Sequence, residues 1–324
     1  MKKRYMFFLA YLFFVLNAFT QNANPFIEFI YNNPFLEREL YFSNPELLRG
    51  KILKTSSEDY DISSDGVKSY GDVYGSVKLL SYFFFNNDNI LEKEYFISIN
   101  EEDGIPNTIK INSFQYDEDT VLVSYDEYST TLYKNFYKSK QEKEEYTVEY
   151  DKEKDCKLYK YYDSNRELIK EIQVTKGKKT IKDSVFVSEP LIRIYTYEDN
   201  KCEEKLFYGE ELLGILMYKN GVEICHTQET YKNTGKLVFK TDFNESFNEG
   251  ISVTQTFMDG VLSKEQYTGK VSVEYNPAGF VEYKKIIPYE GEGAKGSYSI
   301  YNAEILDSED EFLLEILAKI KNVI

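Results

Sequence analysis

The chain is poor in the residues that most often carry chemistry. Its 324 residues include no Trp, one His, three Cys and four Met. Metal sites and activated nucleophiles are commonly built from His and Cys, so this composition leaves little material for either. The cysteines show no C-x-x-C spacing, which gives structural zinc and thiol redox chemistry no support.

Long hydrophobic runs are also missing after the first twenty residues. Three basic residues at positions 2–4 precede an apolar run at 5–16, a pattern typical of a signal peptide. We expect cleavage after Thr20, with Ala23 as the rival site and an uncleaved anchor as the alternative. No later run approaches the roughly 18 apolar residues of a spanning helix, so we expect an exported, soluble mature chain with no transmembrane segment.

The chain has fewer basic than acidic residues. The chain has 39 basic and 55 acidic residues, a formal charge of −16, and loss of the signal peptide with its three basic residues would make it −19. Such a field repels phosphate backbones, so nucleic acid is not an expected partner.

Aromatic residues, in contrast, are abundant, with 30 Tyr and 23 Phe. Between residues 51 and 306, short aromatic or alternating stretches are separated by Asn, Asp, Gly and Ser, which indicates strands and tight turns. Helical patterns between them are missing, which disfavours a parallel α/β sheet. We therefore predict a mainly β domain, an antiparallel meander of stacked hairpins in a twisted sheet or β-solenoid. The strand candidates include 81–85, 108–116, 121–125, 145–150 and 191–197.

Internal repetition supports the hairpins. Several segments share an aromatic strand end, a polar turn containing Gly, Asn or Asp, and an aliphatic residue after the turn. They are 218–224, 231–237 and 275–281, a shortened copy at 257–262, and degenerate copies at 162–168 and 197–202. Gly, Asn and Asp suit these turns because tight hairpins require positive φ.

The copy at 275–281 resembles the Tyr-Asp-x-x-Gly-Arg-Leu core of YD-type (Rhs-like) repeats, with Asn276 and Phe280 in place of Asp and Arg. It is similar, more loosely, to MORN-like variant repeats. The resemblance covers at most residues 155–285. It implies a β scaffold, shell or binding surface and carries no catalytic residues with it.

Residues 21–50 form a separate N-terminal segment. Asn-Pro occurs there at 24–25, 33–34 and 44–45, and Asn before Pro suits the start of a helix. We expect two or three short helices or helical turns, or alternatively a string of Asn-Pro turns.

Residues 307–324 predict one C-terminal amphipathic helix. Ser308 is the expected N-cap, and acidic residues follow it. The helix either packs on the sheet and caps its open end or binds a partner. Its apolar face comprises Phe312, Leu313, Ile316, Leu317 and Ile320.

One group of residues has the oxygen spacing of a calcium loop, with Gly66 at the sharp turn. The candidate ligands are Asp61, Ser63, Asp65 and Asp72. Asp72 stands where a longer bidentate Glu is usual, and flanking helices are not evident, so a plain turn is the favoured interpretation. We predict no other metal or cofactor.

An active site is not marked in the sequence. His226 cannot form a dyad with Cys225 if both lie on one strand, because adjacent side chains point to opposite faces. Cys202 and Cys225 lie on strands that we expect to be neighbours, so one disulfide or three free thiols remain open. The acidic clusters at 101–103, 117–119 and 210–211 lie beside turns and indicate solvated hairpin ends.

The sequence therefore predicts a non-catalytic binding or structural protein of the periplasm or cell surface, with a protein or glycan partner in the cell envelope. Two alternatives stay open. One is a carboxylate-dependent hydrolase of an extracellular polymer, and the other is an accessory subunit that docks through its C-terminal helix.

Overall fold

Strands make up most of the computed structural model. It describes residues 25–36, 45–63, 68–69, 77–100, 104–130, 135–184, 189–198, 201–219, 222–229, 235–276, 281–289 and 295–321. The predicted signal peptide lies outside these residues.

The helical elements are α2 (Pro25–Asn32), the short 3-10 helix η1 (Pro45–Leu48) and α3 (Glu311–Lys321). The first strands are β1 (Ile52–Ser63), β2 (Lys68–Ser69), β3 (Val77–Phe85), β4 (Leu91–Asn100), β5 (Ile105–Tyr116), β6 (Thr120–Thr130), β7 (Phe136–Asp151), β8 (Cys156–Tyr162) and β9 (Leu168–Thr175). The later strands are β10 (Lys178–Asp183), β11 (Leu191–Glu198), β12 (Lys201–Tyr208), β13 (Glu211–Lys219), β14 (Val222–Glu229), β15 (Gly235–Phe243), β16 (Glu249–Met258), β17 (Val261–Tyr275), β18 (Val281–Pro288) and β19 (Lys295–Leu306).

The sheet closes on itself, which corrects the prediction of a twisted open sheet or solenoid. From β3 to β19 each strand pairs antiparallel with the next, and β1 pairs with β19 on one side and β3 on the other. Apart from β2, which pairs only with β1, the strands form a single eighteen-stranded barrel. Closure supplies hydrogen-bond partners to what would otherwise be two open edges. The mainly β, antiparallel hairpin meander is confirmed, and each of the five strand candidates lies within a strand.

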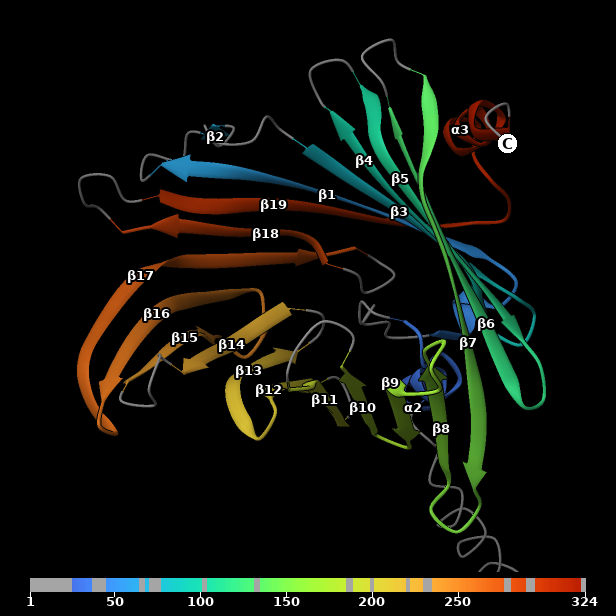
Figure 1. Ribbon diagram of the computed structural model, residues 1–324. Helices are drawn as coiled ribbons and strands as arrows, with labels where there is room; N and C mark the ends of the chain where they lie inside the picture. Colours follow the sequence, from blue (N-terminus) through green and yellow to red (C-terminus); the bar gives the residue numbers. More distant parts are fainter. Residues whose placement is uncertain are drawn as a thin grey trace, which may run out of the picture.

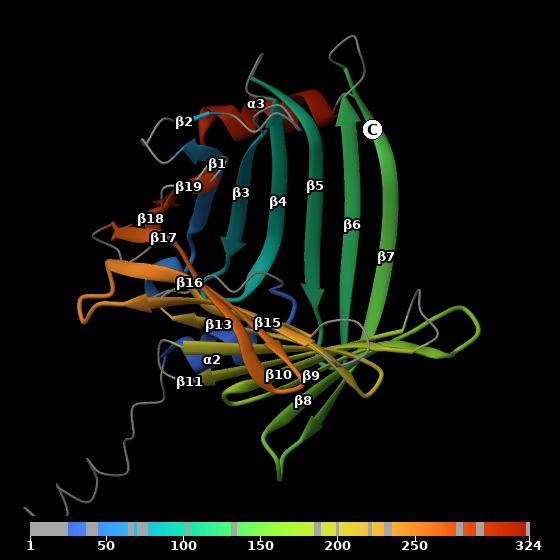
Figure 2. The same cartoon turned by 90° about the vertical axis from the view of Figure 1, so that its left-hand side faces the viewer.

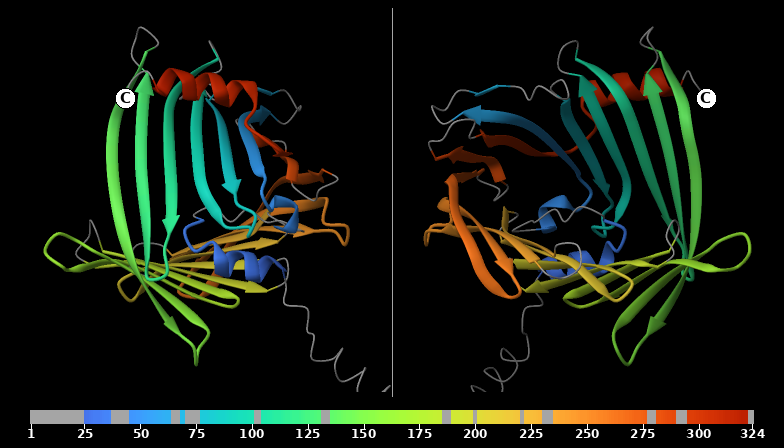
Figure 3. Two further views of the ribbon diagram at one scale, coloured as in Figure 1. Left: turned by 90° about the vertical axis from the view of Figure 1, so that its right-hand side faces the viewer. Right: turned by 60° about the vertical axis from the view of Figure 1, so that its left-hand side comes forward.

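Two parts of the barrel cross each other (Figures 1 and 2). Strands β3–β7, here called the wall, stand side by side, and β8–β13, here called the floor, run across their lower end. Helix α2 lies at the junction of the two, inside the barrel. Helix α3 lies against the outer side of the wall (Figure 3).

Strand alternation places the two larger core clusters on opposite faces of the wall, an inner and an outer cluster, and a smaller third cluster contains Phe247, Val271 and Val273. Phe83 belongs to the inner cluster, with the N-terminal segment and floor residues such as Val174. Its neighbour Tyr82 belongs to the outer cluster, with α3. Both faces of the wall are therefore buried, and each is covered by a different end of the chain.

Helix α3 is docked rather than free. Leu313, Ile316 and Ile320 are buried against the wall, which matches the expected packing on the sheet. The N-cap is Asp310 and not Ser308, because the Asp310 carboxylate accepts a 2.9 Å hydrogen bond from the Leu313 amide. Among the residues that the structure describes, no helix is long and apolar enough to cross a bilayer.

The N-terminal segment contains helices after two of its three Asn-Pro pairs, α2 and η1. At the remaining pair, Asn33-Pro34, the chain turns instead. The Asn33 side chain is fully buried there and serves as a hydrogen-bonding centre rather than a cap.

The turn of the shortened copy at 257–262 uses positive φ, as predicted. The turn residues of the copies at 197–202, 218–224, 231–237 and 275–281 lie outside the described residues. In the β16–β17 turn, Asp259 and Gly260 have φ values of 50° and 76°. This matches the two positive values of a type I′ turn.

The cysteines do not lie on neighbouring strands as expected. Strand β13 separates Cys202 on β12 from Cys225 on β14, and the strand register places the two side chains on opposite faces. Both thiols are free.

Candidate ligand-binding cavity

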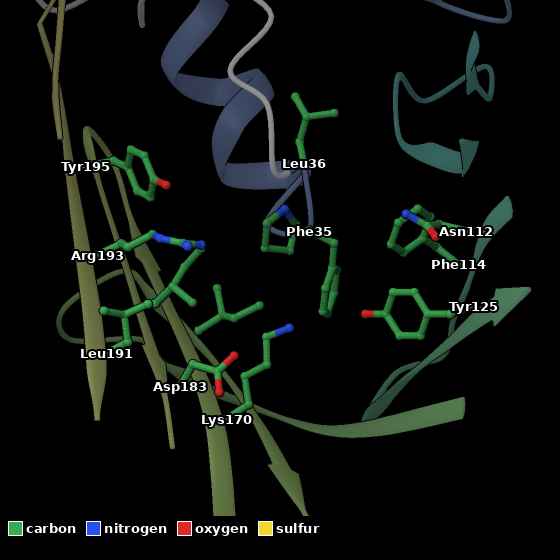
Figure 4. A pocket seen from close by; sticks show the side chains of 13 residues that line it. Phe35, Leu36, Asn112, Phe114, Tyr125, Lys170, Asp183, Leu191, Arg193 and Tyr195 are labelled. Atoms are coloured by element: carbon green, nitrogen blue, oxygen red, sulfur yellow. The ribbon is translucent and has the colours of Figure 1, made fainter. Parts of the chain in front are cut away.

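A cavity of about 90 Å³ lies inside the barrel, between the N-terminal segment, the wall and the floor (Figure 4). Residues 34–36 form one side of it, strands β5 and β6 another, and strands β9–β11 the third. The cavity is therefore formed where three parts of the chain, far apart in sequence, converge. Its polar lining residues are Asn112, Tyr125, Lys170, Asp183, Arg193 and Tyr195.

Asn33 fixes the N-terminal side. Its amide nitrogen donates to the carbonyl oxygens of Phe29 and Asn89, at 2.8 and 3.1 Å, and its oxygen accepts from the Leu91 amide at 2.6 Å. All of these groups are buried, so the turn after α2 has its hydrogen bonds completed by the wall.

Lys179 holds the other end of the same segment. Its side chain is fully buried, and its ammonium donates a 3.0 Å hydrogen bond to the Leu36 carbonyl. The ammonium also lies 4.8 Å from the centre of the Tyr195 ring, within range of a cation–π interaction. A floor strand thus binds the segment at the point where it borders the cavity.

One end of the cavity is aromatic. The Phe35 ring lies 5.8 Å from the Phe114 ring and makes edge-on contacts with Tyr146 and Tyr159 at 5.0 and 5.3 Å. Such edge-on pairs are favourable beyond the apolar area that they bury. Phe35 and Phe114 therefore offer a fixed apolar surface to anything bound beside them.

Polar groups surround the Phe35 ring. In Figure 4 the charged ends of Lys170 and Arg193 point toward the space on one side of Phe35, and the Tyr125 hydroxyl points toward it from the side of Phe114. The Tyr125 hydroxyl donates to Glu144 at 3.1 Å, and Lys170 lies 3.9 Å from the same carboxylate.

Glu144 also accepts a hydrogen bond from Tyr146. Burial, with additional contributions from Tyr125 and this carboxylate, raises the pKa of Tyr146 well above its ordinary value. The Tyr146 hydroxyl therefore remains a donor to Glu144 across the physiological pH range.

Arg193 differs from the other charged residues of the cavity. Within the described part of the chain its guanidinium forms no ion pair or hydrogen bond, although Asp183 lies on the same lining. The side chain is exposed, and its register partner is Ile181 rather than an acid. Five N–H donors are thus available to a bound molecule.

A second hollow of about 150 Å³ adjoins the cavity and shares Asn112 and Tyr125 with it. Two ion pairs lie on its lining: Lys140 lies 2.9 Å from Glu142, and Lys110 lies 3.7 Å from Glu127. The remaining charged residue, Asp126, lies 2.8 Å from Lys138. The charged residues of this hollow therefore all form ion pairs within the protein.

Of the calcium-loop candidates, Asp61 and Ser63 lie at the end of β1, where it pairs with β19, and are not part of the cavity lining. Asp65 and Asp72 lie outside the described residues. Across the described part of the chain, no three His, Cys, Asp or Glu side chains come together as a metal site would require.

The remaining sequence candidates are structural. His226 lies on β14 with its ring 5.9 Å from Phe239, and the strand register puts Cys225 on the opposite face. The acidic residues at 117–119 and 210–211 are exposed at hairpin ends, as expected.

Sequence reasoning missed the cavity residues. One signal was present: Arg193 interrupts the otherwise apolar and aromatic stretch 191–195. A cation in such a strand indicates either a solvent face or a polar interior. These two cases cannot be distinguished from the sequence, because the difference depends on closure of the barrel.

Scans of known protein families and of curated proteins gave no match. Among solved structures, a porin-like protein from Bacteroides uniformis aligns over 78% of this chain and 96% of its own, with 11% identity and a TM-score of 0.24. Transferrin binding protein B from Haemophilus parasuis aligns over 80% of this chain and 76% of its own, with 8% identity and a TM-score of 0.15. At these scores neither similarity carries a conclusion about this chain.

Proposed function

We propose that this protein is an exported, non-catalytic binding protein of the periplasm or cell surface that holds a small ligand inside its barrel. The observation that carries the proposal is the cavity between the N-terminal segment, the wall and the floor. It combines a fixed aromatic surface at Phe35 and Phe114 with the free guanidinium of Arg193. Binding sites typically join an apolar lining to a few placed polar groups in this way.

The hydrogen bonds around the cavity favour binding over acid–base catalysis. Glu144 accepts from Tyr125 and Tyr146, Glu94 from Asn112, and Glu204 from Tyr195. A hydrolase acting through carboxylates needs two that converge on the scissile bond, with one held protonated. These carboxylates instead serve to position the neighbouring side chains.

Docking of a partner through the C-terminal helix has less support. The apolar face of α3 already packs on the wall through Leu313, Ile316 and Ile320. A partner that used this face would first have to displace the helix.

The proposal is tested by comparing fragment binding to the mature protein with fragment binding to a variant whose cavity is filled by a larger side chain. Small carboxylates, amines, sugars and neutral aromatics would be screened by ligand-detected NMR against the mature protein and Ile181→Phe, which adds bulk inside the cavity. Lys182→Phe is the matched control, because Lys182 neighbours Ile181 on β10 and points to the outer face. We expect at least one fragment to bind the mature protein and Lys182→Phe and to be lost in Ile181→Phe. If no fragment shows this dependence, the proposed function is wrong.

A further inference from the structure

We infer that the ligand of this cavity is a small monocarboxylate, or the carboxylate end of a larger molecule, with a planar apolar part. The inference rests on the proposed function and adds the chemical class. The carboxylate pairs with the Arg193 guanidinium, and the apolar part lies against Phe35 and Phe114.

The distribution of hydrogen bonds around the cavity supports a carboxylate. Most donors of the inner surface already serve protein acceptors: Tyr125 donates to Glu144, Asn112 to Glu94 and Lys179 to Leu36. Within the described residues Arg193 is the donor on this lining that has no acceptor. A guanidinium binds a carboxylate through two parallel N–H···O bonds, a geometry that suits a planar anion.

A second cation stands beside the same space. Lys170 shares the lining with Arg193. Its ammonium lies 3.9 Å from the Glu144 carboxylate, which is beyond hydrogen-bond distance, so its N–H donors are available to a ligand. The Lys170 side chain is only 16% exposed, so its charge is weakly screened by solvent. One anionic group of a ligand would lie between the two cations.

The acidic neighbours limit the ligand to a single negative charge. Asp183 lies on the lining, and Glu144 accepts a hydrogen bond from the lining residue Tyr125. A second carboxylate on the ligand would add a negative charge beside these two acids, and neighbouring like charges are unfavourable. The site thus discriminates against dicarboxylates and polyanions.

Volume and shape restrict the enclosed part of the ligand. At roughly 10–15 Å³ for each water-sized site, a cavity of about 90 Å³ takes about six to nine non-hydrogen atoms. The rings of Phe35 and Phe114 favour a flat apolar group beside them. Benzoate lies at the upper end of this size range and has both features.

The test compares benzoate with benzamide, its uncharged analogue of nearly equal shape. Dissociation constants would be measured by NMR titration for the mature protein, Arg193→Gln and Lys182→Gln, the last removing a positive charge from the outer face of the floor. We expect the mature protein and Lys182→Gln to bind benzoate with similar affinity and benzamide much more weakly. Arg193→Gln should lose about ten- to a hundredfold in benzoate affinity. The benzoate affinity of Arg193→Lys should lie between those of the mature protein and Arg193→Gln.

Two kinds of failure are distinguishable. If benzamide binds as well as benzoate, or if only fragments without a carboxylate bind, and Ile181→Phe still abolishes binding, the carboxylate assignment is wrong and the proposed function stands. If Arg193→Gln leaves benzoate affinity unchanged, the assignment is likewise wrong. If Ile181→Phe alters the binding of no fragment, both are wrong. Thermal unfolding of each variant checks that a lost affinity does not come from a lost fold.

Discussion

Replacement of the buried Asn33 by Ala should release the N-terminal segment from the barrel. The Asn33 side chain forms three hydrogen bonds, two of them to the wall, at Asn89 and Leu91. In Asn33→Ala the Leu91 amide is left buried without its acceptor, and two carbonyls lose a donor. A buried polar group without a partner costs about 1–3 kcal/mol. With the carbonyls and the small void included, we expect a loss of about 2–4 kcal/mol in the free energy of unfolding.

Urea denaturation followed by circular dichroism measures this loss, and hydrogen exchange locates it. Amides of residues 25–36 and of Leu91 should exchange faster in Asn33→Ala, since the segment would open before the barrel unfolds. Asn87→Ala is the matched control. Asn87 is exposed in the neighbouring turn, so its loss should change stability by less than about 0.5 kcal/mol. Equal stability of the two variants would refute the role of Asn33.

Asn33→Asp sharpens the test. Its carboxylate can still accept from the Leu91 amide, but it faces the carbonyl oxygens of Phe29 and Asn89 with no proton to donate. At neutral pH we expect Asn33→Asp to be at least as destabilised as Asn33→Ala. The difference should shrink as the pH falls and the carboxyl takes up a proton.

Three further predictions concern the outer face of the wall. Ile316→Ala should cost about 2–5 kcal/mol by urea denaturation, because Ile316 is buried under α3, whereas Leu314→Ala, at a position 52% exposed, should cost little. Burial would raise the pKa of Asp310, but hydrogen bonds from Lys54 and neighbouring donors outweigh it and hold the pKa below 3.8. The ionised Asp310 therefore stabilises the fold above pH 3.8, and this contribution is lost as the pH falls below that value. Asp310→Asn should abolish this acid dependence of stability. Burial, followed by nearby acidic groups, raises the pKa of Tyr95 to about 12, so stability should fall as the pH rises from 10 to 12, and less steeply in Tyr95→Phe.

The strands and their turns were predictable from sequence because their signals are local. Aromatic and β-branched alternation marks each strand, and Asp259-Gly260 supplies the two positive φ values of its turn. Helix α3 was predictable for the same reason, although its N-cap was not. Both Ser308 and Asp310 are good caps, and the ion pair of Asp310 with Lys54, 2.6 Å long, favours the later start.

Closure of the barrel was not predictable because it depends on contacts between distant residues. The pairing of β1 with β19 joins Ile52 to Leu306, which lie at opposite ends of the β domain in the sequence. Neither strand has a sequence feature that identifies the other as its partner. The cavity depends on that closure. In the sequence, Lys170 and Arg193 look like ordinary strand residues. Only the closed barrel brings both to the inner face, on the same cavity lining as Phe35 from the N-terminal segment.

The most direct test of this account is a crystal structure of the mature protein with benzoate. We predict residues 25–36 inside the barrel, the benzoate carboxylate within hydrogen-bond distance of the Arg193 guanidinium, and its ring against Phe35 and Phe114. Benzoate bound on the outer face, or an N-terminal segment lying outside the barrel, would contradict the account.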